Sequence, residues 1–384
     1  MSEAPLGVWP ALVVGAGPAG LATSGELSRL GIPHVVLERG DSLAYQWTRL
    51  YESLTLHTGK HLSALPGMSF PRATPLFPTR LQFLDYLNEY ARSLRLPVRT
   101  GCSVTAVERS RDGWRLTTPQ GDLRARRLVV ATGILSNPIV PVLPGRELFR
   151  GRLMHSIEYH SPGPFRSRRV LVVGAGNSAG EISAELARAG ARVTVAVRSG
   201  ALALPRQILG IPIQYFAVLM TKLPVAVQQS FKRATGVVSE WLRGPPVLPR
   251  PPRSACPEVP LIGHHMVDAI RDGSIQLRRG ITGMTEEGVR FQDGSLEPFD
   301  DVILGTGYRA AVGFMEGLIK IDDCGFARRT KRVVSLDQPD LYFVGHNYDT
   351  TGGLYNIRRD STLVAKTLAA QGAQSEPSPD GPTG

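Results

Sequence analysis

The chain has 384 residues, of which 42% are hydrophobic and 20% are charged, and a formal net charge of +11. This length allows two or more domains with a well-buried core, and the composition is typical of a globular protein. No apolar run reaches the ~18 residues that span a bilayer, and the first ten residues lack the charged and apolar regions of a secretion signal. We therefore expect a cytoplasmic protein without a transmembrane segment.

Charge and cysteine content exclude two further classes of function. The arginines are scattered and their runs are as short as Arg126–Arg127, which indicates a solvated surface rather than a nucleic-acid interface. Some of them can instead bind phosphate-rich cofactors. The cysteines Cys102, Cys256 and Cys324 are far apart and form no Cys-x-x-Cys pair. The sequence therefore predicts neither a disulfide framework, nor a redox dithiol, nor a metal site.

Residues 8–40 alternate strand, glycine turn, helix and strand, which predicts a βαβ unit. Gly15 makes the turn, Gly17 lets the backbone approach a pyrophosphate, and Gly20 lets the helix pack closely on the strand. The helix N-terminus offers free N–H groups to the phosphates. Glu38 ends the second strand, where its carboxylate can accept the ribose hydroxyls. A bound dinucleotide is the preferred interpretation, and a tight turn without a ligand is the alternative.

A second unit of the same kind runs over residues 170–197, and its turn contains Gly174, Gly176, Asn177 and Ser178. Its second strand ends in Arg198 and Ser199 instead of an acid. This pair suits a 2′-phosphate, so NADPH is favoured over NADH. The alternative is an exposed arginine at a strand end.

Two buried strands each stop at a run of small residues. The runs are Ala131-Thr132-Gly133 and Gly305-Thr306-Gly307, the second followed by Tyr308. Each comes after its own nucleotide unit, where the chain would cross between domains. We therefore predict an α/β protein with two Rossmann-like dinucleotide-binding domains.

Residues 205–252 are rich in proline and large apolar side chains. The stretch is too long for a simple loop and too interrupted to span a membrane. We interpret it as two short helices, over 208–220 and 225–241, that cover a substrate entrance. A membrane-surface or subunit-contact element is the alternative. Residues 372–384 have nothing to bury and are expected to be disordered.

The segment from Phe149 to Tyr159 carries Phe, Gly, His and a final Tyr at the spacing that identifies flavin-containing monooxygenases. The chain resembles class B flavin monooxygenases over nearly its whole length. It is most similar to their YUCCA-type branch, through Leu204-Pro205-Arg206 after the arginine and serine of the second unit and through the run from Leu304 to Tyr308. The resemblance implies FAD and NADPH, with the NADPH domain inserted into the FAD domain. The FAD domain would comprise residues 1–150 and 301–371, and the NADPH domain residues 151–300.

The resemblance also implies further cofactor contacts. Gln46 and Trp47 would lie near the flavin, and other contacts would come from Pro18, Ala19, Arg39, Val104, Ala131, Thr132, Gly133, Thr306, Gly307, Tyr308, Gly353 and Leu354. Several relatives have an Asn near the flavin in the stretch that corresponds to residues 54–60. This chain has none there, so His57 and Thr58 are the candidate catalytic residues. His155 is expected to hold the domains in place by a hydrogen bond, with acid–base work and plain packing as alternatives.

By the same resemblance, NADPH would reduce FAD and oxygen would add to its C4a position. The peroxide formed would transfer one oxygen atom to a small organic substrate, by N-, S- or C-oxygenation or by oxidative decarboxylation of a 2-oxo acid. Baeyer–Villiger enzymes end the identifying segment with Trp, and the Tyr at position 159 disfavours that reaction. An FAD-dependent NADPH reductase or oxidase and a non-enzymatic redox sensor are the remaining alternatives. A homodimer is the expected assembly.

Overall fold

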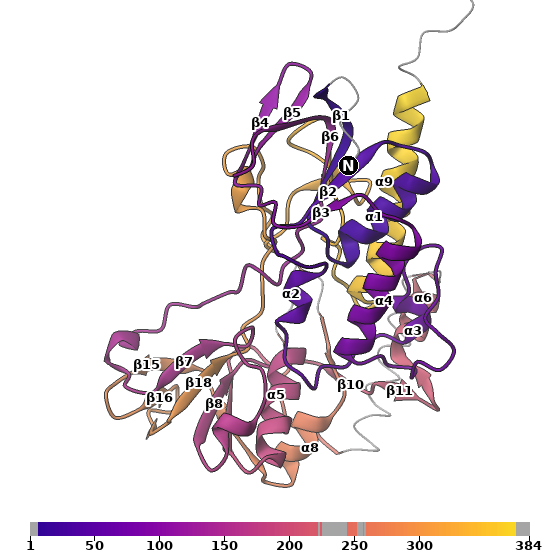
Figure 1. The fold of residues 1–384 in the computed structure, drawn as a ribbon. Coiled ribbons are helices and arrows are strands. Elements are labelled where there is room, and N and C mark those ends of the chain that lie inside the picture. Colours follow the sequence, from indigo (N-terminus) through magenta and orange to yellow (C-terminus); the bar gives the residue numbers. More distant parts are fainter. Residues whose placement is uncertain (1–6, 222, 225–243, 252–255, 257–258, 374–384) are drawn as a thin grey trace, which may run out of the picture.

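The computed structural model describes residues 7–221, 223–224, 244–251, 256 and 259–373. Two large sheets organise this part of the chain, one in the upper and one in the lower half of Figure 1. Each sheet is built around parallel strands, with helices on one face and further β-structure on the other, so its central strands are buried on both sides.

The first sheet has the order β19-β20-β21-β6-β1-β2-β3, and the β4–β5 hairpin extends from β6. Strand β1 pairs in parallel with β2 and β6, and β21 pairs in parallel with β6. The strands are β1 (Trp9–Val14), β2 (His34–Leu37), β3 (Val98–Arg99), β4 (Ala106–Ser110), β5 (Gly113–Thr117), β6 (Leu123–Val130), β19 (Arg329–Thr330), β20 (Val334–Ser335) and β21 (Leu341–Phe343).

One face of this sheet is covered by α1 (Pro18–Arg29), α4 (Arg80–Ser93) and α9 (Gly353–Ala373). Helix α4 begins with a capping box between Thr79 and Gln82, which satisfies backbone N–H groups of its first turn. The β4–β5 hairpin buries Trp114 against the other face. The short helices α2 (Tyr45–Thr48) and α3 (Lys60–Ser63) lie in the connection between β2 and α4.

The second sheet is parallel throughout, with the order β14-β9-β8-β18-β7. Its strands are β7 (Arg152–His155), β8 (Arg169–Val173), β9 (Arg192–Val197), β14 (Ile275–Arg279) and β18 (Asp301–Leu304). One face packs on α5 (Asn177–Arg188) and α8 (His265–Arg271). The other face packs on a small antiparallel sheet of β15 (Ile281–Met284), β16 (Val289–Phe291) and β17 (Leu296–Glu297).

The chain leaves the first sheet after β6, builds the second sheet from β7 to β18, and returns to the first sheet with β19 to β21 and α9 (Figure 1). This confirms the predicted α/β fold, in which one dinucleotide-binding unit is inserted into the other. Short 3₁₀ helices lie at η2 (Arg146–Leu148), η3 (Gly163–Phe165) and η4 (Gly313–Met315).

The region predicted as two helices over 208–220 and 225–241 differs in its first part. Residues 207–212 form a hairpin, because Leu209 and Gly210 both have positive φ and turn the chain back. Helix α6 (Ile213–Met220) begins only after it, and residues 225–241 lie outside the described ranges. The strands of this region are β10 (Ala203–Leu204), β11 (Gln207–Ile208), β12 (Ile211–Pro212) and β13 (Leu261–Ile262). Of the expected disordered tail, residues 372–373 belong to α9, and the rest lies outside the described part.

Candidate functional site

The outer glycines of the two nucleotide turns are required by the protein's own packing. A Cβ on Gly15 would lie 2.7 Å from the Ala131 carbonyl oxygen, and one on Gly174 would lie 2.3 Å from that of Gly305. Both residues also have positive φ. A Cβ on Gly20 would lie 1.7 Å from the Gly15 oxygen. Each small-residue run of the sequence therefore lies beside its own glycine turn.

The middle glycine of each turn has a different environment. A Cβ on Gly17 or Gly176 would have no atom of the described chain within 4 Å. These two glycines are the N-caps of α1 and α5, and neither helix has a side-chain cap. The backbone N–H groups of each first turn, such as those of Ala19 in α1 and Ser178 in α5, therefore have no side-chain cap. Space and unpaired donors at a helix N-terminus fit a pyrophosphate, so both turns fit a dinucleotide.

Glu38 is buried at the end of β2. Its Oε2 accepts a hydrogen bond from the Ala16 N–H at 2.8 Å, and its Oε1 accepts one from the Gly40 N–H at 3.0 Å. Each carboxylate oxygen can accept about two hydrogen bonds, so each keeps capacity for a ribose hydroxyl. The position fits the predicted role.

The residues predicted near the flavin, Gln46 and Trp47, lie on α2. Arg39 donates from Nη2 to Oε1 of Gln46 at 3.1 Å, and the Gln46 amide reaches the Leu135 carbonyl at 3.4 Å. Trp47 meets the ring of Phe83 edge-on, with 4.8 Å between centroids. Val104 is half-buried against the core on the other face of the first sheet.

In the second turn, the Asn177 side chain hydrogen-bonds other parts of the protein. Asn177 donates from Nδ2 to the Pro260 carbonyl at 3.2 Å and accepts from the Ile262 N–H at 2.7 Å, which holds β13 against α5. Arg198 and Ser199 are exposed just after β9, with Nε of the arginine 3.4 Å from the serine hydroxyl. An exposed guanidinium beside a hydroxyl at this strand end fits a 2′-phosphate.

The outward and return linkers between the two sheets are hydrogen-bonded to each other. The Thr132 hydroxyl donates to the Ala311 carbonyl at 2.8 Å, and the Thr306 hydroxyl donates to the Ile139 carbonyl at 2.5 Å. The Gly307 carbonyl accepts the Ile139 N–H at 2.9 Å. The two small-residue runs therefore also fix the hinge between the domains.

His155, at the end of β7, contacts this hinge. Its Nε2 lies 3.2 Å from the Gly307 carbonyl oxygen, and its ring packs edge-on against Tyr308. Burial lowers the pKa of His155 and raises that of Tyr308. The Tyr308 hydroxyl lies 3.4 Å from that of Ser156. This geometry agrees with the hydrogen-bonding role expected for His155.

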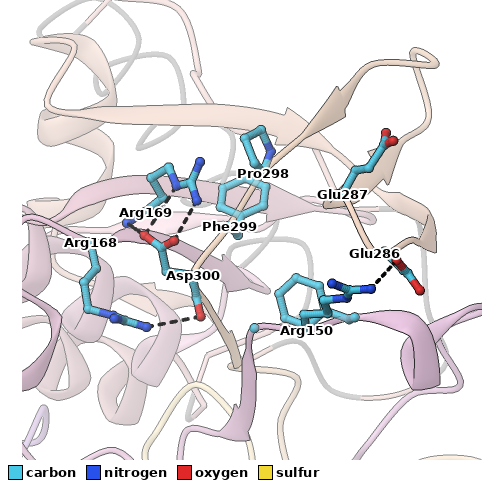
Figure 2. A pocket seen from close by; sticks show the side chains of 10 residues that line it. Arg150, Arg168, Arg169, Glu286, Glu287, Pro298, Phe299 and Asp300 are labelled. Carbon is cyan, nitrogen blue, oxygen red and sulfur yellow. Dashed lines mark hydrogen bonds and ion pairs between the residues drawn. The ribbon is translucent and has the colours of Figure 1, made fainter.

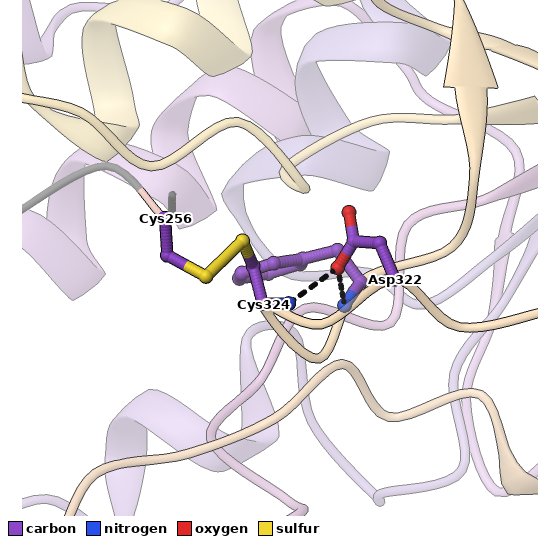
Figure 3. The surroundings of a disulfide bond; sticks show 4 residues. Cys256, Asp322 and Cys324 are labelled. Atoms are coloured by element: carbon purple, nitrogen blue, oxygen red, sulfur yellow. Dashed lines mark hydrogen bonds between the residues drawn. A yellow bond between two sulfur atoms is a disulfide. The ribbon is translucent and has the colours of Figure 1, made fainter. Parts of the chain in front are cut away.

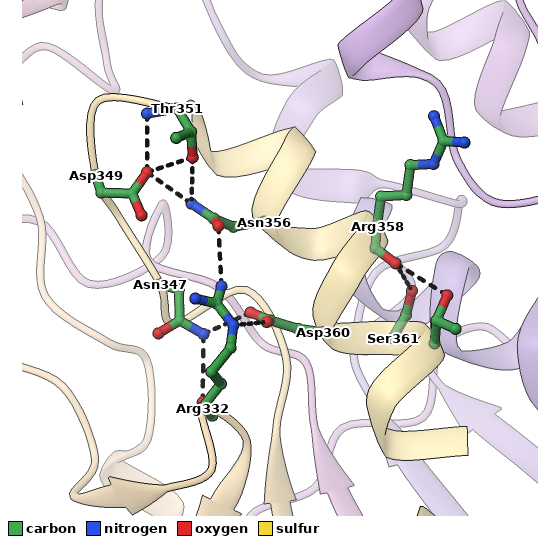
Figure 4. Close-up of polar contacts among 9 residues, drawn as sticks. Arg332, Asn347, Asp349, Thr351, Asn356, Arg358, Asp360 and Ser361 are labelled. Atoms are coloured by element: carbon green, nitrogen blue, oxygen red, sulfur yellow. Dashed lines mark hydrogen bonds and ion pairs between the residues drawn. The ribbon is translucent and has the colours of Figure 1, made fainter. Parts of the chain in front are cut away.

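The loop before α9 is held by a polar network that Figure 4 shows. Asp360 is fully buried and accepts from Arg332 Nε at 2.9 Å and from Asn347 Nδ2 at 2.5 Å. Arg332 also donates to the Asn356 amide oxygen at 2.9 Å, and Asn356 donates to Asp349 at 3.0 Å. Burial raises the pKa of Asp360, although these donors oppose the effect. The network fixes the start of α9, where the predicted contacts are Gly353 and Leu354.

Of the candidate catalytic residues His57 and Thr58, His57 lies at the contact between the two domains. His57 Nε2 lies 2.7 Å from Oε1 of Glu181 on α5, and the Tyr51 hydroxyl donates to Oε2 of the same carboxylate at 2.5 Å. Burial alone would raise the pKa of Glu181, but the hydrogen bonds from His57 and Tyr51 lower it overall. Thr58 is buried, and a Cβ on Gly352 would lie 2.7 Å from its hydroxyl oxygen.

Sequence reasoning did not identify Tyr51 or Glu181 as site residues. Glu181 is one helical turn after Asn177 on α5, near the second glycine turn. The one sequence signal for Glu181 is its position in the first turns of that helix. The contact itself joins residues 124 positions apart, which no local pattern encodes.

Figure 2 shows a surface hollow at the amino ends of β7, β8 and β18. Arg150 pairs with Glu286 at 2.5 Å, and Arg169 pairs with Asp300 at 2.6 Å. The hydrogen bonds from Arg169 lower the pKa of Asp300 to about 2. Ligands of parallel α/β sheets bind at the carboxyl ends of the strands, whereas this hollow lies at the amino ends and its arginines are already paired with acids. The hollow is therefore structural.

The cysteine spacing predicted no disulfide framework, and for one pair of cysteines that prediction was wrong. Cys256 and Cys324 form a disulfide with a Cα–Cα distance of 5.4 Å (Figure 3). The pair links the region between α6 and β13 to the loop between β18 and β19. The fold brings together residues separated by 68 positions, which spacing rules for local motifs do not detect. Cys102 is free and buried.

The described residues include no helix that is long and apolar enough to cross a membrane. Within the same ranges, no group of three or more His, Cys, Asp or Glu side chains could hold a metal ion.

Two nucleotide-binding folds joined by a short hinge define a class of flavin- and nicotinamide-dependent oxidoreductases. The family model "Pyridine nucleotide-disulphide oxidoreductase" matches residues 12–207. The flavin-containing monooxygenase from Stenotrophomonas maltophilia has a similar structure, with a TM-score of 0.74 and 23% identity, over 94% of this chain and 98% of that one.

Curated relatives specify the branch. The chain is 36% identical to the rice (Oryza sativa subsp. japonica) protein "Indole-3-pyruvate monooxygenase YUCCA1", over 94% of this chain and 91% of the relative. It is 37% identical to the Arabidopsis thaliana protein "Probable indole-3-pyruvate monooxygenase YUCCA1", over 94% and 89%. The chain belongs to the class B flavin-containing monooxygenases, in their YUCCA-type branch. It is an FAD-containing enzyme that uses NADPH and oxygen to oxygenate a small organic substrate.

Proposed function

We propose that this monooxygenase decarboxylates an aromatic 2-oxo acid oxidatively. The observation that carries the proposal is the similarity to indole-3-pyruvate monooxygenases over 94% of the chain. The balanced reaction converts the 2-oxo acid, oxygen, NADPH and a proton into the shorter carboxylic acid, carbon dioxide, water and NADP⁺. One oxygen atom enters the new carboxylate and the other leaves as water.

The domain roles are part of the proposal. Residues 1–150 and 301–371 bind FAD, and residues 151–300 bind NADPH. FAD, when bound, accepts a hydride from NADPH and activates oxygen. The chain's own residues bind and orient: the α1 N-terminus holds the FAD pyrophosphate, Glu38 holds the ribose, and Arg198 with Ser199 holds the 2′-phosphate of NADPH. This division is supported by the open space at the middle glycine of each turn.

His57 and Thr58 have separate parts in this proposal. His57 joins the domains, because its Nε2 is engaged by Glu181. Thr58 is the candidate for stabilising the oxygen-reactive site, since the residue is buried and its hydroxyl lies beside Gly352, next to the start of α9. The protein's main task is to exclude water from that site.

A Baeyer–Villiger reaction is disfavoured by Tyr159, whose hydroxyl donates to Glu185 at 2.8 Å and fills the position where those enzymes have Trp. A reductase, an oxidase or a redox sensor would give no oxygenated product. Substrate-stimulated NADPH consumption, with mass analysis of products from a 2-oxo acid, a ketone, an amine and a thioether, distinguishes these activities. We expect the 2-oxo acid to give the acid one carbon shorter; turnover of the amine or the thioether alone would refute the proposal.

The cytoplasmic location and the homodimer expected from the sequence also stay proposals. Cell fractionation tests the location. Light scattering on the eluting protein tests the assembly, with a mass of twice 41.6 kDa expected for the dimer.

A further inference from the structure

Arg206 reaches from the region after β10 to the first domain. Its Nη2 donates to the Thr55 hydroxyl at 3.0 Å and to the Leu56 carbonyl at 2.7 Å. Its guanidinium carbon lies 4.0 Å from the centre of the Phe77 ring. Two hydrogen bonds and a stacked aromatic ring therefore fix both the plane and the direction of this cation.

Most of the hydrogen-bonding capacity of Arg206 is unused. The side chain has five N–H groups, and within the described chain only those of Nη2 have partners. The Nε–H is buried and unpaired. The one acid noted near it, Glu181, is already engaged by Tyr51 and His57.

A buried, unpaired guanidinium N–H is costly, which indicates that something else pairs with it. Burial lowers the pKa of Arg206, although Glu181 opposes the effect, yet an arginine stays charged in proteins. An anion or another strong acceptor would satisfy this N–H.

The surroundings of Arg206 suit an aromatic acid at the domain contact. A Cβ on Gly59 would lie 3.0 Å from Pro212 and 3.4 Å from the Tyr215 ring, so the β11–β12 hairpin and α6 pack on the segment after Leu56. The same segment contains Thr58, which contacts the start of α9. Arg206 thus hydrogen-bonds the start of the segment that carries Thr58, and the Phe77 ring lies against its guanidinium.

We propose that Arg206 binds the carboxylate of the substrate through its unused Nε and Nη1 groups and so selects 2-oxo acids over uncharged ketones. The inference rests on the proposed function, because only an acidic substrate needs this cation. A phosphate of NADPH has similar chemistry, so the experiment separates the two anions.

The test compares the wild-type holoenzyme with Arg206→Met, Arg206→Lys and the control Arg72→Met, which removes the same charge from an exposed position. Calorimetry measures binding of indole-3-propionate, of its primary amide and of NADP⁺ to the oxidised enzyme. We expect Arg206→Met to weaken carboxylate binding roughly 10- to 100-fold, the range for hydrogen bonds to a charged group. Amide and NADP⁺ binding should stay within about twofold, since neither uses the charge.

Arg206→Lys keeps a point charge but loses the planar fork, so its preference for the carboxylate over the amide should fall without disappearing. Arg206→Lys also tests the role of the guanidinium if Arg206→Met does not fold. The inference is overturned if both variants bind the carboxylate as the wild type does, if acid and amide weaken equally, or if NADP⁺ binding alone is lost.

Failure of the two proposals can be told apart. If the wild type decarboxylates 2-oxo acids and the Arg206 variants keep the wild-type KM for them, the function stands and the role of Arg206 is refuted. If the wild type does not act on 2-oxo acids, both proposals fail.

Discussion

The contact of Glu181 with Tyr51 and His57 links the two domains, and replacing it should slow hydride delivery more than it weakens cofactor binding. The Glu181 and His57 side chains are mostly buried, with exposed fractions of 21% and 23%. Hydrogen bonds to a charged group contribute about 1.5–3 kcal/mol each, and a neutral one contributes about 1 kcal/mol. Glu181→Gln loses two hydrogen bonds to a charged group and regains one neutral hydrogen bond. The interaction free energy between the domains therefore falls by about 3 kcal/mol.

Such a loss corresponds to roughly a 100-fold shift in the equilibrium between aligned and misaligned domains. Hydride transfer needs the reacting atoms about 3–3.5 Å apart. We therefore expect flavin reduction by NADPH, followed anaerobically by stopped flow, to slow 10- to 100-fold, on the order set by that shift. Flavin content and NADP⁺ affinity should not change, because the glycine turns and Arg198 are intact.

Glu185→Gln is the matched control, since Glu185 lies one turn later on α5 and accepts its hydrogen bond from Tyr159 of the same domain. Equal slowing in both variants, or wild-type reduction in Glu181→Gln, would refute the reasoning. The pKa of Glu181 is lowered in the folded protein, so its stabilising effect is complete above the ordinary value of 4.5 and is lost as the pH falls through the lowered value. The stability difference between wild type and Glu181→Gln should accordingly vanish in acid.

Four further outcomes are expected. Gly20→Ala puts a Cβ 1.7 Å from a backbone oxygen of the first turn, so the purified variant should contain no flavin; normal flavin absorbance would contradict this. Arg198→Gln should raise the KM for NADPH by about 10-fold or more and leave that for NADH unchanged, which steady-state kinetics checks. Denatured protein should titrate one thiol, Cys102, before reduction and three after it. Cys324→Ser, which opens a 68-residue loop, should lower the free energy of unfolding by about 4 kcal/mol on a chain-entropy basis, and an unchanged urea midpoint would argue against the crosslink.

Local patterns account for the features that the sequence revealed. A glycine with positive φ between a buried strand and a helix is a short-range requirement, so both turns were visible from Gly15 and Gly174. Glu38 was visible because the length of a βαβ unit fixes its distance from the first turn. The two runs of small residues marked the crossings between domains, and the resemblance to flavin monooxygenases implied the inserted arrangement.

Contacts between distant segments were not visible. Glu181 meets His57 only after two domains fold and dock, and Cys256 meets Cys324 in the same way. Arg206 stood in a motif that marked the family, but its unpaired Nε became apparent only from the packing around it. The hairpin at 207–212 was missed because apolar side chains outweighed the turn signal of a single glycine.

The most direct test of the central claim is the fate of ¹⁸O₂ in a reaction with NADPH and indole-3-pyruvate. If the chain is a monooxygenase that decarboxylates 2-oxo acids, the shorter carboxylic acid should carry one heavy oxygen atom per molecule, with one NADPH consumed for each. NADPH consumption that yields only labelled hydrogen peroxide, or an acid product without the label, would contradict the account.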